Sequence, residues 1–169
     1  MSEVTPVTRN RPTERGSEKE TLTGLLDFLR ATAVNKVAGL TDEQAFSRPV
    51  AASALTPAGV VRHLTGIERF WFSIDFADED VPWPWTDDDP HGAFRPGEGE
   101  TLAGIVAAYT RECARSRQVV AAADLDDPAR GPNMDFTLRY ALAHMVEETA
   151  RHCGHLDLLR ESIDGAAGE

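Results

Sequence analysis

Residues 138–161 read LRYALAHMVEETARHCGHLDLLRE and contain His144, His152 and His155, three of the five histidines in the chain. The stretch also repeats apolar residues at spacings of three and four, which is typical of an amphipathic α-helix. On a helical wheel with about 100° per residue, one face carries Leu138, Ala141, Met145, Leu156, Leu159 and Ile163. We therefore predict a long helix from about Phe136 to Ile163 whose apolar face joins the core.

The same face also carries ionisable residues. His152 lies in its middle and Glu148 at its edge, while His144 and His155 lie slightly further round. The spacing of four brings the side chains of Glu148 and His152 together on one side of the helix. A buried carboxylate is costly unless it is paired or binds a metal. The pattern therefore indicates either part of a metal site or a hydrogen-bonded pair without metal.

A second helix is predicted from Pro57 to about Asp75. Thr56 suits the N-cap position, and Pro57 suits the first helical position, where its missing N–H costs nothing. Its buried face is predicted to consist of Val60, Leu64, Ile67, Trp71 and Ile74. His63 lies near the edge of that face.

Helical bundles build metal sites from inward-pointing side chains on facing helices. The periodicity therefore selects His63, Glu148 and His152 as candidate ligands of a divalent metal such as zinc. A hydrogen-bonded His–Glu–His set without metal remains the alternative. His91 lies in a polar segment and has no such support, and Arg151 is expected to be a surface charge.

The remaining sequence predicts an all-α protein. We expect a helix over 18–38, a short helical turn over 40–46 and a third long helix over 101–123. No segment alternates with period two over the length of a strand, so we expect a four-helix bundle. The connection over 76–100 is rich in proline and aspartate. Its tryptophans could form a lid over the site, pack the connection down or line a dimer contact; they are Trp83 and Trp85.

The domain organisation predicted is simple. Residues 1–17 are expected to form a flexible N-terminal arm, 18–165 one helical domain and 166–169 a frayed tail. The net charge of −11 argues against a nucleic-acid partner. No apolar run is long enough to span a membrane, and the N-terminus has no signal-peptide core, so we expect a cytoplasmic protein without a membrane partner. Cys113 and Cys153 are expected to be reduced thiols.

The pattern of His63-Leu in one helix and Glu148-Thr-Ala-Arg-His-Cys-Gly-His155 in the last resembles the DinB/YfiT-like superfamily of metalloenzymes, over about residues 18–165. The last stretch resembles an uncharacterised actinobacterial branch. The resemblance implies an up-down-down-up bundle with a long crossover between helices 2 and 3. It also implies a divalent metal bound by His63, Glu148 and His152, and a homodimer. Most members have histidine where this chain has Glu148. In that respect the set is similar to the zinc-binding His–Glu–His set of mycothiol-dependent maleylpyruvate isomerases.

The resemblance further implies a transferase that acts on a small-molecule substrate with a low-molecular-weight thiol such as mycothiol. Zinc is the first expectation for the metal, with nickel, manganese or iron as alternatives. His144 and His155 are then candidate catalytic proton carriers, although both also fit the polar edge of a core. The isomerases carry an additional C-terminal domain that this sequence does not contain, so we do not expect the isomerase reaction. A non-catalytic metal-binding or stress-response protein and a metal-dependent hydrolase are the rival interpretations.

Overall fold

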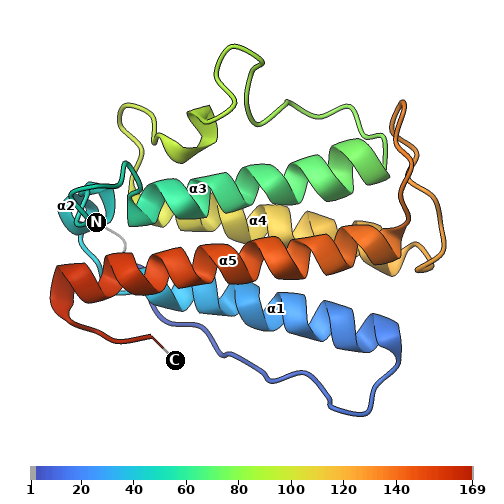
Figure 1. Ribbon diagram of the computed structural model, residues 1–169, viewed down its shortest axis with the longest axis horizontal. Helices are drawn as coiled ribbons and strands as arrows, with labels where there is room; N and C mark the ends of the chain where they lie inside the picture. The colour runs from blue at the N-terminus through green and yellow to red at the C-terminus, as the bar shows by residue number, and fades with distance from the viewer. Residues whose placement is uncertain (1–2, 169) are drawn as a thin grey trace.

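The computed structural model describes residues 3–168, and its regular elements are all helical (Figure 1). Within this part of the chain the only β-type pairings are two isolated bridges, Thr86 with Asp89 and Pro128 with Thr137. The all-α prediction is confirmed. Residues 1–2 of the predicted arm and residue 169 of the predicted tail lie outside the described residues.

The first two helices begin where local capping chemistry favours them. In α1, Glu18–Val37, the Ser17 hydroxyl accepts a hydrogen bond from the Glu20 backbone N–H, and the Glu20 carboxylate accepts one from the Ser17 N–H. The short helix α2, Asp42–Phe46, begins with the same reciprocal arrangement between Thr41 and Gln44. Each capping box satisfies backbone donors that the helix itself cannot.

The three later α-helices are α3, Pro57–Glu68, α4, Leu102–Ala121, and α5, Leu138–Asp164. As predicted, the Thr56 hydroxyl caps α3 by accepting from the Gly59 N–H. Helix α5 ends at Gly165, whose φ of 76° is a left-handed conformation that glycine adopts without strain. The predicted bounds of the first, third and last long helices agree with the structure to within two residues.

The predicted helix over 57–75 is only partly correct, because an α-helix becomes a π-helix after Glu68. The π-helix η1, Arg69–Phe76, has wider turns closed by bonds between residues five apart. Wider turns rotate the following residues away from their positions on an α-helical wheel. The predicted burial of Trp71 and Ile74 is therefore wrong, since both are half-buried. The buried side chains of η1 are instead Phe72, Ser73, Asp75 and Phe76.

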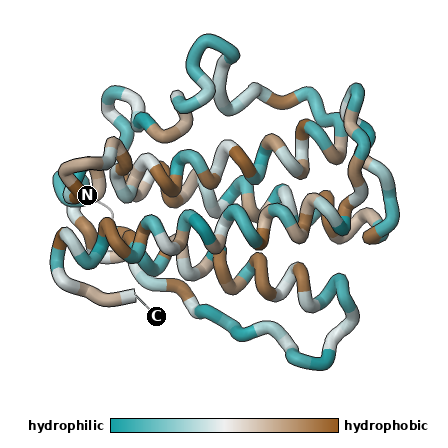
Figure 2. The backbone as a smooth tube through the Cα atoms, viewed as in Figure 1, coloured by the Kyte–Doolittle hydropathy of each residue, from teal (hydrophilic) through white to brown (hydrophobic). Residues whose placement is uncertain are grey.

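The four long helices lie side by side, with α5 between α1 and α3 in the view of Figure 1. Helix α1 packs along α5, while α3 packs against both α4 and α5. Apolar residues concentrate on the helices, and the N-terminal segment and the connections are mostly hydrophilic (Figure 2). The up-down-down-up order stays a prediction. No helix within residues 3–168 is long and apolar enough to cross a membrane.

The connection over 77–101 passes over α3 (Figure 1) and is less irregular than predicted. It contains a short 3-10 helix, η2, Gly92–Phe94. Two glycines of α3 lie beneath it. A Cβ at Gly59 would overlap the backbone carbonyl oxygen of Phe94, and a Cβ at Gly66 would lie 3.0 Å from the Cβ of Pro84. The connection can approach α3 this closely only because these residues have no side chains.

The N-terminal segment packs against α1. The Val7 backbone N–H donates to Asn35 Oδ1 at 2.7 Å, and Asn35 Nδ2 donates back to the Val7 carbonyl oxygen at 3.0 Å. Val4 is buried, and its carbonyl oxygen accepts from the Gly39 N–H. The flexibility expected of this arm stays a prediction.

Candidate metal centre

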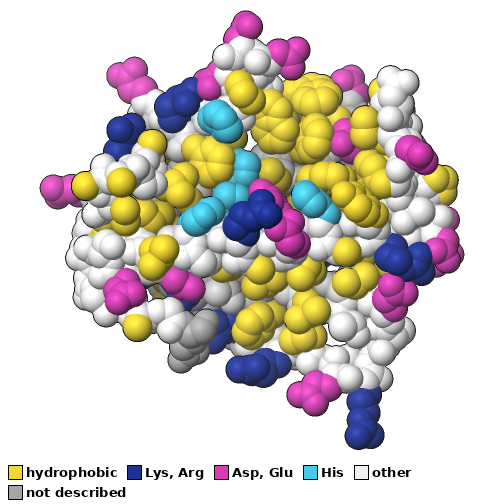
Figure 3. Space-filling view, viewed as in Figure 1, with side chains coloured by type: hydrophobic (Ala, Val, Ile, Leu, Met, Phe, Trp, Pro, Cys, Tyr) yellow, Lys and Arg dark blue, Asp and Glu magenta, His cyan; other side chains and the backbone are white. Residues whose placement is uncertain are grey.

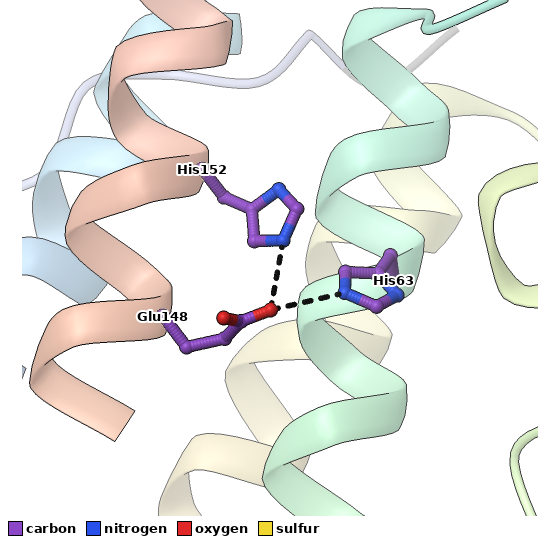
Figure 4. A group of neighbouring side chains, drawn as sticks. All are labelled: His63, Glu148 and His152. Carbon is purple, nitrogen blue, oxygen red and sulfur yellow. Dashed lines mark hydrogen bonds and ion pairs between the residues drawn. The ribbon is translucent and has the colours of Figure 1, made fainter. Parts of the chain in front are cut away.

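Three side chains from two helices converge between α3 and α5 (Figure 4). His63 comes from α3, and Glu148 and His152 come from successive turns of α5. One potential ligand atom from each lies within 4.8 Å of the other two. His152 Nε2 is 3.2 Å from Glu148 Oε1, and His63 Nε2 is 3.8 Å from the same oxygen. The structure thus brings together the three residues that the sequence selected as ligands.

Burial keeps both histidines of this cluster neutral near pH 7. Burial, and to a lesser extent the neighbouring His152, lower the pKa of His63 to about 4, although Glu148 partly opposes both effects. Burial also lowers the pKa of His152, against the opposing influence of Glu148. A neutral imidazole has a free lone pair on one ring nitrogen, which is the form that binds metals.

Glu148 and His152 each have a second polar partner. Arg151 Nη1 donates to Glu148 Oε2 at 2.9 Å, which leaves Oε1 directed toward the two histidines, and its Nη2 contacts Glu147. On the other side of His152, its Nδ1 lies 3.3 Å from Nδ1 of His155. Partners of this kind orient metal ligands in known sites. Arg151 is exposed as predicted, but its contact with the cluster was not foreseen.

His63 has a different environment. Its ring stacks on the ring of Phe94 with centroids 3.9 Å apart and an interplanar angle of 12°. Its Nδ1 is buried without a hydrogen-bond partner among the described residues. Its Nε2 is too far from Glu148 Oε1 for a hydrogen bond. The contact of Phe94 with His63 was not predicted, since no pattern in the sequence links position 94 to His63.

The two candidate catalytic histidines lie in different places. His155 contacts the cluster through His152, whereas His144 contacts neighbours further along α5 and η1. The His144 ring lies 4.3 Å from Trp71 and 6.2 Å from Tyr140, and its Nδ1 is 3.9 Å from Glu147. Figure 3 shows histidines on this face among patches of hydrophobic side chains. His144 therefore belongs to an aromatic group beside the three converging residues.

Both loop tryptophans lie against Phe70. The rings of Trp83 and Trp85 lie 5.6 Å and 5.0 Å from that of Phe70. Trp85 is half-buried, while Trp83 is 60% exposed. The aromatic ring that covers His63 belongs to Phe94, so the connection reaches the cluster through η2.

The fold and this site together define a helical protein with a His–Glu–His set, typical of metal ligands, between two neighbouring helices. Residues 21–165 match the sequence model of the family described as mycothiol-S-transferase. The chain belongs to this family, which is DinB/YfiT-like. Membership implies a transferase activity related to mycothiol and a small-molecule substrate. Among curated proteins, no sequence matches the chain.

Proposed function

We propose that the protein is a divalent-metal-dependent transferase that uses mycothiol or a similar low-molecular-weight thiol, with His63, Glu148 and His152 as the metal ligands. The observation that carries the proposal is the convergence of these three side chains in a chain of the mycothiol-S-transferase family. Zinc fits a set of two imidazoles and one carboxylate, and nickel, manganese and iron are the alternatives.

The donor atoms support a bound cation. Neutral His63 directs Nε2 toward Glu148 Oε1 across 3.8 Å, and Nδ1 of the same ring is buried without a partner. A buried polar group without a hydrogen bond is costly. A cation held by Nε2 and the carboxylate would bridge these two groups across a gap too long for a hydrogen bond, whereas Nδ1 would then carry the ring proton and would depend on its packing. The residues present therefore fit a divalent metal.

The number of converging ligands favours catalysis over a purely structural site. Within residues 3–168 the group contains three side chains, and structural zinc sites usually have four protein ligands. A site with three protein ligands leaves a coordination position for substrate. This supports the transferase interpretation over that of a non-catalytic metal-binding protein.

The proposed reaction depends on converting the thiol of the cofactor into a thiolate. A divalent metal at this position would lower the pKa of a coordinated thiol and so supply a thiolate at neutral pH. The sulfur would form a bond to an electrophilic carbon of the acceptor, and the leaving group would depart with the electron pair. For His152 to offer its Nε2 lone pair, its Nδ1 must carry the proton and donate to Nδ1 of His155. We propose that His155 fixes this tautomer and that His144, beside Trp71, carries protons for the acceptor.

We also propose two finer structural features. One is the DinB-like up-down-down-up four-helix bundle, formed by a single domain over 18–165. The other is a homodimer. The side-by-side packing of the four long helices, α1 against α5 and α3 against α4 and α5, supports the first expectation.

The test combines metal analysis with a thiol-transfer assay. Protein purified without added metal should contain about one divalent ion per chain. It should also consume mycothiol in the presence of an electrophilic acceptor. His63→Ala and His152→Ala should lose the ion and the activity together, whereas His91→Ala should keep both. If the metal-loaded protein hydrolyses test esters and consumes no thiol, the hydrolase interpretation is supported instead.

A further inference from the structure

We propose that Phe94 is the positioning residue for His63, and that η2 is a strap docked on α3 to hold this ring in place. The inference rests on the proposed metal-binding function. Glu148 is oriented by Arg151, and His152 contacts His155. His63 has no hydrogen-bonded partner of this kind among the residues described, and the flat face of its ring rests on Phe94. Packing therefore takes the place that an outer hydrogen bond has for most metal-binding histidines.

The surface of α3 is shaped to receive the strap. Gly59, His63 and Gly66 follow one another at spacings of four and three, so they lie on one face of the helix. The Phe94 carbonyl oxygen occupies the space that a Cβ of Gly59 would need, and Pro84 lies against Gly66. The two glycines therefore allow the connection to lie directly on either side of His63.

Arg62 fastens the strap next to this face. Its Nη1 donates to the carbonyl oxygens of Gly92 and Ala93, both at 3.1 Å, and its Nε donates to Glu100 Oε2 at 3.1 Å. The backbone of η2 is thus bound at the residues that immediately precede Phe94. Ala93 is buried at 2% exposure, so the strap is part of the packed structure.

The Phe94 ring also lies close to the second histidine. Its centroid is 5.7 Å from that of His152, and the rings of His63 and His152 are 4.7 Å apart. One aromatic side chain therefore forms a wall beside both imidazoles. Removing it would let His63 rotate about its side-chain bonds and would admit water to the ligand atoms.

The first experiment measures Co²⁺ binding to the metal-free full chain by its visible spectrum. Replacing an outer partner of a metal ligand typically weakens metal affinity 10- to 100-fold, and we expect a loss in this range for Phe94→Ala. Phe94→Tyr and Phe94→Trp, which keep a flat ring, should restore most of the affinity. Trp83→Ala is the matched control, because Trp83 is an exposed aromatic residue of the same connection that packs on Phe70 instead.

A second pair of variants moves the strap without changing any side chain that touches the cluster. Gly59→Ala should push Phe94 away and reproduce the loss of Co²⁺ affinity. Gly104→Ala on α4 is its control, since the nearest atom to its added Cβ is the Thr101 hydroxyl at 3.3 Å. Circular dichroism and the melting temperature of the metal-free variants show whether each one is folded.

The stacking is also measured without metal. The Phe94 ring should shift the His63 ring-proton resonances upfield in the NMR spectrum, and Phe94→Leu should abolish that shift. Unchanged His63 resonances in Phe94→Leu, or undiminished Co²⁺ affinity in a folded Phe94→Ala, would overturn the role of Phe94. Failure of the wild-type chain to bind Co²⁺, with the His63 resonances still responding to Phe94→Leu, would overturn the proposed metal function and leave the positioning role supported.

Discussion

Arg30 on α1 and Glu68 at the end of α3 form an ion pair within the core. Arg30 Nε and Nη2 donate to the two carboxylate oxygens of Glu68 at 2.7 and 2.6 Å, and the two residues are 5% and 0% exposed. Glu68 is also the last residue before the π-helix. Neither partner stands out in the sequence, because each is one polar residue in an amphipathic helix. Their burial depends on how α1 and α3 pack.

Removal of one charge from this pair should be strongly destabilising. We expect Glu68→Gln to lower the free energy of unfolding by about 3 kcal/mol, because the buried Arg30 guanidinium would lose its buried charged partner and keep only the half-exposed Asp27, which contacts its Nη1. Urea denaturation measures the change. The control is Glu79→Gln, which removes the partly exposed pair with Arg115 and should cost about 0–1 kcal/mol. Equal losses for the two variants would contradict the role given to the buried pair.

The two cysteines should be chemically inert in the folded protein. Burial raises the pKa of the Cys153 thiol to about 12 and raises that of Cys113 well above its usual value. Only the thiolate reacts rapidly, so a disulfide reagent at pH 8 should label neither residue in the native protein. Both should react once urea unfolds the chain. Fast labelling of the native protein would mean that this part of the core opens readily.

At the scale of elements, the end of the π-helix depends on a turn that follows α4. Arg130 N–H donates to the Phe76 carbonyl oxygen, and Gly131 N–H donates to that of Asp75, both at 2.9 Å. These bonds satisfy backbone acceptors at the end of η1. A Cβ at Gly131 would lie 2.6 Å from the Asp75 carbonyl oxygen. The turn therefore needs glycine at this position.

Gly131→Ala should accordingly destabilise the fold. The added methyl group must displace backbone, and overpacking of this kind typically costs about 1–3 kcal/mol. Gly154→Ala in α5 provides the contrast, because no atom lies within 4 Å of its added Cβ. That change should stabilise the helix by roughly 0.5–1 kcal/mol. The melting temperatures of the two metal-free variants should shift in opposite directions from that of the metal-free wild type. A similar melting temperature for Gly131→Ala and the wild type would contradict the packing described for Gly131.

The regularity of each element decides which residues of the site can be predicted from the sequence. Glu148 and His152 were predictable because their spacing on one helix fixes their proximity. His63 was predictable because α3 is a regular α-helix up to Glu68, so its wheel is reliable at position 63. The same wheel was wrong at Trp71, because the π-helix intervenes. Phe94 was not predictable, since its contact depends on how a long connection lies on another helix.

At the scale of the whole molecule, metal binding should stabilise the fold because the proposed ligands join α3 to α5. A ligand that binds only the folded state, at 100 times its dissociation constant, adds about 2.7 kcal/mol. Treatment with a chelator should therefore lower the melting temperature by several degrees, and Zn²⁺ should restore it. His152→Ala should melt at the same temperature with and without chelator, while His91→Ala should behave like the wild type. Unchanged melting of the wild type after complete metal removal would argue against the site.

The stability of the metal-free protein should also depend on pH. The pKa of His63 is about 4 in the folded state, against an ordinary value of about 6.5 in the unfolded chain. The unfolded state therefore binds the proton more readily, and stability is lost as the pH falls from about 6.5 toward 4. The free energy of unfolding should fall by about 3 kcal/mol in total over this pH range. His63→Gln should have a flatter stability profile over this interval, and an unchanged profile would contradict the assignment.

The origin of the ligands from α3 and α5 has a consequence for biosynthesis. His63 leaves the ribosome long before Glu148 and His152, which belong to the last helix of the described chain. The nascent protein cannot assemble the complete set of three until α5 has been synthesised and has docked beside α3. The proposed metal can therefore bind all three ligands only after both helices have been made, and a nascent chain that stops before α5 offers it His63 alone.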